Sequence, residues 1–207
     1  MELSKWSDPS TRKRHLFGDR FSLLLHLSSE DENSVRRLPV LSGRGYALGK
    51  IMTPVELLLL NLEEVRRRSL IIWRSIPPRR MEWRPSAEAR SCIKIVRHVL
   101  RAEWTHTQIL RRGKSLDSDA SPFNSKLLLD INSELEFAEP YRREFLTLVG
   151  SYTPAQLVEN KIDRSEAGYV RSVGDFVLRI AYHEAVHTGQ LLSYLRMMET
   201  PIPKIWD

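Results

Sequence analysis

Two histidines interrupt the apolar stripe of one long predicted helix near the end of the chain, and this pattern constrains the fold most. The stripe follows steps of three and four through Phe176, Ile180, His183, His187, Leu191, Tyr194 and Met198. Side chains at positions i and i+4 of a helix stand about 5–6 Å apart. His183 and His187 can therefore both reach one metal ion, whereas two hydrogen-bonded core histidines are the plainer alternative.

Two further helices are predicted upstream. The motif Thr53-Pro54-Val55-Glu56 is a capping box with proline at the first helical position, so a helix is expected from there to about Ser75. The next helix is expected to begin at Ser86 or Ser91 and to end near Gly113. Both have apolar positions at helical spacing, so each needs a partner to bury one face.

The middle of the chain contributes a third long helical region. Residues 126–135 and 140–149 are predicted to be helical, and Pro140 either begins a second helix or kinks a continuous one. A second capping box at residues 153–156 opens a short turn, and residues 158–171 are predicted to form an irregular crossover. No convincing period-two strand pattern is present. The fold class expected is all-α, a four-helix bundle with a metal site between the second and last helices.

Composition limits the class of protein. Residues 1–50 show no sustained period and are predicted to be an N-terminal extension, poorly ordered or loosely packed, before a bundle over 51–207. The one cysteine, Cys92, excludes a disulfide framework and a multi-cysteine zinc site within the chain, and is expected in the core. No apolar run approaches the ~18 residues of a membrane span, so we expect a soluble cytoplasmic protein with no membrane partner.

The chain is basic, with 32 Lys and Arg against 26 Asp and Glu and a net charge of +6. Residues 51–101 hold much of this excess, with 11 basic and 5 acidic side chains. Runs such as Arg66-Arg67-Arg68 and Arg79-Arg80 lack the stacking aromatic residues typical of nucleic-acid interfaces. We therefore favour a solvated helix face over a nucleic-acid partner.

A third histidine has the position that a metal site would need. His98 shares the apolar seam of the second predicted helix, whereas His106 lies eight residues later, about 12 Å along the axis. His98 and His106 therefore cannot both bind the same ion. His106 is expected to be a half-exposed surface group. His98, His183 and His187 would leave a coordination position open, which is typical of catalytic zinc. Imidazole also suits nickel, iron or copper; we expect zinc or nickel first, with iron as a further candidate.

The residues from His183 to His187 also match the metalloprotease pattern H-E-x-x-H. In that pattern Glu184 would be the general base for a metal-bound water; the alternative is a solvated carboxylate or one that only orients a ligand. A protease is disfavoured because Gln190 and Ser193 occupy the places where the metzincin pattern needs glycine and histidine. The sheet that lines protease clefts is also not evident in the sequence.

His98, followed by His183-x-x-x-His187-x-Gly189-Gln190 and Tyr194-Leu195-Arg196, resembles the DinB family of metalloenzymes. The resemblance extends from about residue 53 to the Pro-x-Ile-Trp-Asp tail, in which we expect Ile205 and Trp206 to pack back onto the bundle. It implies a four-helix bundle with a divalent ion on the three histidines, often as a homodimer. Characterised members include S-transferases and isomerases that use low-molecular-weight thiols, and the family does not imply DNA binding.

We therefore expect a metal-dependent enzyme, first a thiol-dependent S-transferase acting on a small electrophile. A hydrolase with a metal-bound water and a non-catalytic metal-binding bundle are the alternatives. Gln190 and Arg196 are expected to line the substrate pocket or to hold helix contacts. The expected partners are a small-molecule substrate, a low-molecular-weight thiol cosubstrate and a second copy of the chain.

Overall fold

The computed structural model describes residues 52–117 and 120–206, so the predicted extension over 1–50 lies outside the described residues. Four helices of 20 or more residues dominate the described part of the chain. In chain order the elements are α1 (Pro54–Arg74), η1 (Pro78–Arg80), α2 (Cys92–Arg112), η2 (Pro122–Asn124), α3 (Ile131–Gly150), α4 (Pro154–Glu159), β1 (Lys161–Arg164), η3 (Ser165–Ala167), β2 (Tyr169–Ser172) and α5 (Val173–Met197).

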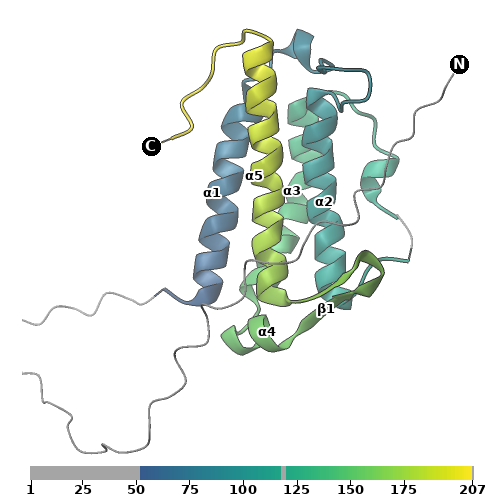
Figure 1. Ribbon diagram of the computed structural model, residues 1–207, viewed down its shortest axis with the longest axis vertical. Coiled ribbons are helices and arrows are strands. Elements are labelled where there is room, and N and C mark those ends of the chain that lie inside the picture. The colour runs from purple at the N-terminus through teal and green to yellow at the C-terminus, as the bar shows by residue number, and fades with distance from the viewer. Residues whose placement is uncertain (1–51, 118–119, 207) are drawn as a thin grey trace, which may run out of the picture. The chain divides into compact units, whose positions relative to one another are not determined.

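The four long helices lie side by side, with the short α4 and the β-strands at one end (Figure 1). Helix α5 packs against both α1 and α2, and α3 packs against the same two helices. Each long helix therefore turns its apolar stripe toward the others, and Trp73, Phe145 and Leu191 are among the fully buried side chains. The expected helical class is confirmed, and α5 is placed where it can share a site with α2.

The first helix begins where the capping box predicts and ends close to the predicted Ser75. The Thr53 hydroxyl accepts a hydrogen bond from the Glu56 amide at 3.2 Å, and the Glu56 carboxylate accepts one from the Thr53 amide at 2.8 Å. Helix α1 then ends at Arg74, with Ser75 as its C-cap. Because both polar ends are satisfied locally, the helix needs the rest of the chain only to bury its apolar side.

Helix α2 begins after Ser91, but the serine side chain does not cap it. Instead, the amides of Cys92 and Ile93 donate to the carbonyls of Trp83 and Met81 at 3.1 and 2.9 Å. The preceding loop therefore supplies the acceptors that a capping side chain would otherwise give. The Trp83 ring packs edge-on against the ring of Tyr194 in α5, with centroids 5.3 Å apart, as expected for a loop that covers the end of the helices.

Helix α3 begins later than the sequence predicted, at Ile131 rather than at residue 126. The Asp130 carboxylate accepts a hydrogen bond from the Ser133 amide at 2.9 Å and so caps the helix there. Residues 126–129 are drawn away from helical geometry because Arg97 of α2 donates to the carbonyls of Lys126 and Leu127, at 2.8 and 2.9 Å. A contact between distant segments thus decides this boundary.

Pro140 lies inside α3, which is one continuous helix. A proline in a helix leaves one carbonyl without its amide partner. Pro140 is exposed, whereas Ala138 and Arg142 are buried, so water can hydrate that carbonyl on the outer face. Packing of the buried face then maintains the helix through the proline.

The prediction of an irregular crossover over residues 158–171 is wrong for most of its length. Strands β1 and β2 form an antiparallel hairpin in which Lys161 pairs with Ser172. Ile162 anchors it in the core with 1% exposure, and Gly168 turns the chain with φ of 82°. The Asp163 amide also donates to the Gly113 carbonyl at 2.7 Å, which ties the hairpin to the end of α2.

The C-terminal tail follows the prediction in part. Ile205 is buried in the core beside Trp73 and Leu195. Trp206 is 68% exposed, although the Arg68 guanidinium lies 5.6 Å from the centroid of its ring. One tail residue therefore completes the core, and the other covers a surface arginine.

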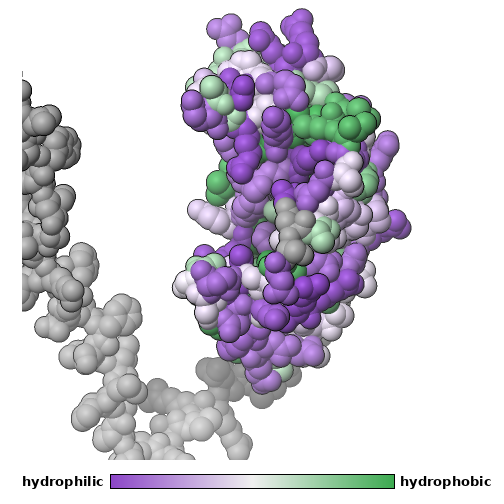
Figure 2. Space-filling model, turned by 90° about the vertical axis from the view of Figure 1, so that its right-hand side faces the viewer, coloured by the Kyte–Doolittle hydropathy of each residue, from purple (hydrophilic) through white to green (hydrophobic). Residues whose placement is uncertain are grey.

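The surface on the side of the molecule shown in Figure 2 is mainly hydrophilic, with a hydrophobic cluster toward one end. Among the described residues, no helix is both long enough and apolar enough to cross a bilayer.

Candidate metal centre

Three histidines from two helices meet in the structure. His98 extends from α2, and His183 and His187 extend from successive turns of α5; one ring nitrogen of each lies within 4.8 Å of the others. The Nε2 atoms of His98 and His183 are 3.1 Å apart. The His187 ring centroid lies 4.8 Å from that of His98 and 4.6 Å from that of His183. These are the three residues that the sequence singled out.

The geometry and the donor set fit one divalent ion. Zinc binds imidazole nitrogen at about 2.0–2.1 Å, so two nitrogens of a tetrahedral site stand about 3.4 Å apart. The 3.1 Å between His98 and His183 is close to this separation. Three imidazole nitrogens suit zinc, nickel or iron, and they leave room for a further ligand. The three histidines can therefore hold a metal ion.

The site keeps two of its histidines, His98 and His183, in the neutral form that binds metal. Burial, with smaller contributions from the Arg90 charge and the other two histidines, lowers the pKa of His98 from 6.5 to about 4. Burial and the neighbouring His187 also lower the pKa of His183. Both rings are thus neutral at neutral pH, and no proton has to be displaced from them before a metal binds.

Gln190 orients the third ligand. Its Oε1 atom lies 3.0 Å from Nδ1 of His187, and because this oxygen can only accept, the Nδ1–H donates to it. The Gln190 amide nitrogen in turn donates to the Tyr194 hydroxyl at 3.1 Å. This arrangement leaves Nε2 of His187 as the ligating atom. The sequence predicted that Gln190 would line the pocket or hold a helix contact; both of its hydrogen bonds are to side chains of its own helix, α5.

The structure buries Glu184 and pairs it with an arginine of α1. The carboxylate is buried, so the expectation of a solvated group is wrong. Its two oxygens accept hydrogen bonds from Nε and Nη2 of Arg66 in α1, at 2.8 and 3.0 Å. A carboxylate that is held in this way has little capacity left to take a proton from a water in the triad.

Glu184 belongs to a buried ion network that receives one charge from each long helix. Arg66 of α1 also donates to Glu103 of α2 at 3.3 Å, and Arg142 of α3 donates to the same carboxylate. Arg142 further donates to the Leu62 carbonyl at 2.9 Å. Two positive and two negative groups balance. The interpretation of Arg66 as part of a solvated face is therefore wrong.

The pairing shifts the ionisation of both central groups. Burial alone would raise the pKa of Glu184, but the charge and hydrogen bonds of Arg66 outweigh it and hold that pKa below 4.5. Burial alone would likewise lower the pKa of Arg66, but the two glutamates raise it. Both groups are charged throughout the physiological range, and each depends on the other.

The remaining predicted candidates lie away from the three ligands. Arg196 is exposed in the last turn of α5. Cys92 is buried in the core, where burial raises the pKa of its thiol to about 11. His106 is only partly exposed, its Nδ1 atom has neither solvent contact nor a hydrogen-bond partner, and its ring centroid lies 6.0 Å from that of His183. It is more enclosed than a surface group, yet it is outside the ligand cluster.

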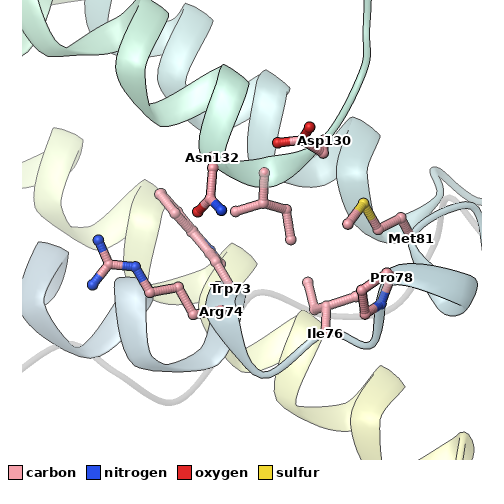
Figure 3. Close-up of a pocket in the computed structure, with 8 residues that line it drawn as sticks. Trp73, Arg74, Ile76, Pro78, Met81, Asp130 and Asn132 are labelled. Atoms are coloured by element: carbon pink, nitrogen blue, oxygen red, sulfur yellow. The ribbon is translucent and has the colours of Figure 1, made fainter.

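A separate hollow of about 580 Å³ lies where the end of α1 faces the start of α3 (Figure 3). Its lining residues are Trp73, Arg74, Ile76, Pro78, Met81, Asp130, Ile131 and Asn132. Asp130 and Asn132 face Ile76 and Pro78 across the opening in this view. None of the three histidines lines this hollow, so it is not the metal centre.

Comparison with known proteins gives one family match and a structural neighbour. The family model of the DinB superfamily matches residues 61–191, which include all three histidines and Gln190. This chain belongs to the DinB superfamily. A DinB-like protein of Bacillus subtilis, YjoA, has a similar fold, with a TM-score of 0.56 and 18% identity over 73% of this chain and 98% of that chain. No protein of curated function matches this DinB superfamily chain.

If the three histidines form one site, each should be needed for metal binding. Replacing His187 with alanine should remove most of the zinc retained after dialysis, because two imidazoles hold zinc weakly. His106→Ala is the matched control and should keep the wild-type content. Elemental analysis gives the zinc content per chain. Equal content in wild type and His187→Ala would contradict the assignment.

The ion network should contribute strongly to stability. Glu184→Gln leaves an excess positive charge in the core, so the free energy of unfolding should fall by about 3–5 kcal/mol. Glu139→Gln, which breaks the exposed pair between Glu139 and Arg143, should cost about 0–1 kcal/mol. Urea unfolding at neutral pH measures both values. Equal losses in the two variants would show that the buried network adds little.

The same pair predicts a pH dependence. Because folding lowers the pKa of Glu184, its stabilising contribution is present above the ordinary carboxyl pKa of 4.5 and is lost as pH falls through the folded value. The stability difference between wild type and Glu184→Gln should therefore shrink in acid. A difference that stays constant from neutral pH down to acid unfolding would contradict this.

Proposed function

We propose that this protein is a metal-dependent S-transferase that joins a low-molecular-weight thiol to a small electrophile. In this proposal His98, His183 and His187 hold one divalent ion, zinc or nickel before iron, inside a four-helix bundle. The observation that carries it is the meeting of three imidazoles from α2 and α5, with His187 oriented by Gln190. A reaction that consumes thiols suits the reducing cytoplasm, where we place the protein.

The chain's own residues have distinct roles in this proposal. A bound divalent ion would supply Lewis-acid chemistry and, with three neutral ligands, would favour an anionic fourth ligand such as a thiolate. His98 and His183 would bind the ion together with His187, whose ring is oriented by Gln190. Arg196 is about 13.5 Å along the helix from His187, too far to touch the ion. It is available instead for the distal part of a long cosubstrate.

The transfer needs less from the protein than hydrolysis would. The thiol loses its proton to solvent, its sulfur forms a bond to a carbon of the electrophile, and the leaving group departs from that carbon as an anion with the electron pair of the broken bond. A hydrolase of the H-E-x-x-H type would need Glu184 as a base, and Arg66 engages both oxygens of that carboxylate. Among the described residues, the potential ligand cluster contains no carboxylate. These observations favour the transferase.

Zinc-loaded protein should therefore accelerate the reaction of 2-mercaptoethanol with chlorodinitrobenzene. Chelation should abolish the effect, and His183→Ala should lower the rate by at least about a hundredfold if the bound ion supplies the catalysis. Arg143→Gln, which changes an exposed arginine of α3, should leave the rate unchanged. Absorbance of the thioether product follows the reaction. Metal binding without turnover of several electrophiles would favour the non-catalytic alternative, and metal-dependent ester hydrolysis would favour the hydrolase.

We also propose that the protein forms a homodimer through α1 and α5. Apolar side chains on these helices are exposed to solvent: Leu57, Leu60, Leu178, Tyr182 and Val186. Such exposure on packed helices is typical of an interface. Sedimentation velocity should show a dimer, which Val186→Arg should convert to a monomer, whereas Leu127→Arg should not. A monomeric wild type at micromolar concentration would contradict this.

A further inference from the structure

A small pocket adjoins the metal centre on the side of the β-hairpin. It encloses about 160 Å³. Its lining residues are His106, Tyr169, Arg171, Phe176, Arg179, Ile180 and His183. Because His183 belongs to both, a molecule in the pocket would lie beside the ligand cluster. The volume is below the roughly 300–1,000 Å³ of sites for drug-sized ligands, so it suits a fragment of a molecule or a small one.

The charges at this pocket are predominantly positive. Arg171 and Arg179 both donate to the carboxylate of Asp175, at 2.9 and 3.1 Å, so two guanidinium groups share one acidic partner. Arg164 lies close by, since it donates to the Tyr169 hydroxyl at 2.8 Å. Its acidic partner, Glu166, is 3.5 Å away and largely exposed. The pocket thus has the electrostatic character to attract an anion.

Two buried polar atoms at the pocket lack partners. The Nδ1 atom of His106 and the Nε–H group of Arg171 have no solvent contact and no hydrogen-bond partner within the described structure. Leaving a buried polar group unsatisfied costs about 1–3 kcal/mol, and such groups are rare in native proteins. Both atoms belong to residues that line this pocket, although neither atom itself reaches solvent, so an oxyanion in the pocket would accept hydrogen bonds from them after a shift of the two side chains.

The remaining wall is apolar. Phe176 and Ile180 from α5 are buried, and the Phe176 ring lies edge-on to that of His106, with centroids 5.5 Å apart. The Tyr169 ring carries the Arg171 guanidinium 4.5 Å from its centroid, which holds the charged group in place. The pocket therefore combines an anion-binding end with an apolar surface.

We propose that this pocket binds the carboxylate of a small, partly apolar substrate, whose reacting end would then extend to the three histidines. The anion site itself stands on the pocket alone, and the direction of the substrate rests on the proposed function. Arg171 and His106 bind the carboxylate oxygens, Arg179 strengthens the positive potential, and Phe176 with Ile180 contacts the apolar part.

Benzoate and benzamide test this proposal, because they have nearly the same shape and only benzoate is charged. The full chain is treated with chelator so that benzoate cannot bind an ion, and binding is followed by calorimetry and by the imidazole NMR signals of His106. Benzoate should bind saturably and shift these signals, and benzamide should bind at least about tenfold more weakly. Equal binding of the two, or no binding, would overturn the proposal.

Substitutions of single arginines test whether benzoate binds in this pocket. Arg171→Gln should weaken benzoate binding by about tenfold or more, and Arg179→Gln should weaken it less. Arg143→Gln, an exposed arginine paired along α3, should have no effect. Arg179 is exposed, so its variant remains informative if Arg171→Gln fails to fold. Unchanged affinity in a folded Arg171→Gln, or in Arg179→Gln where it alone folds, would overturn the proposal.

Zinc content, measured on the same preparations before chelation, separates the two proposals. Benzoate binding without zinc retention in the wild type would preserve the anion site and remove the metal-dependent function. Zinc retention without benzoate binding would remove the anion site and leave the metal-dependent function standing.

Discussion

Four charged side chains, one from each long helix, meet in the core and balance one another. Arg66 joins Glu184 to Glu103, and Arg142 of α3 completes the group by pairing with Glu103. Taking these charges out of water is expensive, and only mutual pairing compensates for it. Helices that rotated or slid past one another would leave a buried charge without its partner. Apolar packing alone tolerates such shifts more easily, because Leu and Ile side chains can repack. The network therefore restricts how the four helices can face each other.

The metal centre depends on this restriction through α5. Successive residues of a helix point about 100° apart, so adjacent positions 183 and 184 serve different neighbours. Glu184 is held by α1, and Thr188 one turn later is also hydrogen-bonded to α1. With those two residues fixed, His183 and His187 are turned toward α2, where His98 meets them. The hairpin then closes the same region from the other side. Structure-stabilising and ligand-bearing residues thus alternate along a single helix.

Periodicity predicted the parts of the molecule that local sequence controls. The capped first helix and the histidine pair at i and i+4 both follow from spacing of a few residues, and the grouping with the histidine of α2 follows from the helical class. The boundary at Asp130 was missed although Asp130 is a good N-cap residue, because the apolar residues before it suggested an earlier start and Arg97 from α2 holds them outside the helix. The hairpin has four-residue strands with Ile162 as its one buried residue, too short for an alternating pattern to stand out. Arg66 and Glu103, like the histidines, occupy positions in the apolar stripes of their helices. The sequence therefore did carry a signal for buried charges at these two positions.

The central claim is that three imidazoles from α2 and α5 hold one divalent ion. X-ray absorption spectroscopy of the zinc-loaded protein tests it most directly, because the spectrum reports the type, number and distance of the ligands. We predict about three imidazole nitrogens at about 2.0–2.1 Å, together with the multiple-scattering features of histidine rings, and one lighter ligand that a thiol can replace with sulfur at about 2.3 Å. A shell of oxygen ligands without the histidine features would contradict the account.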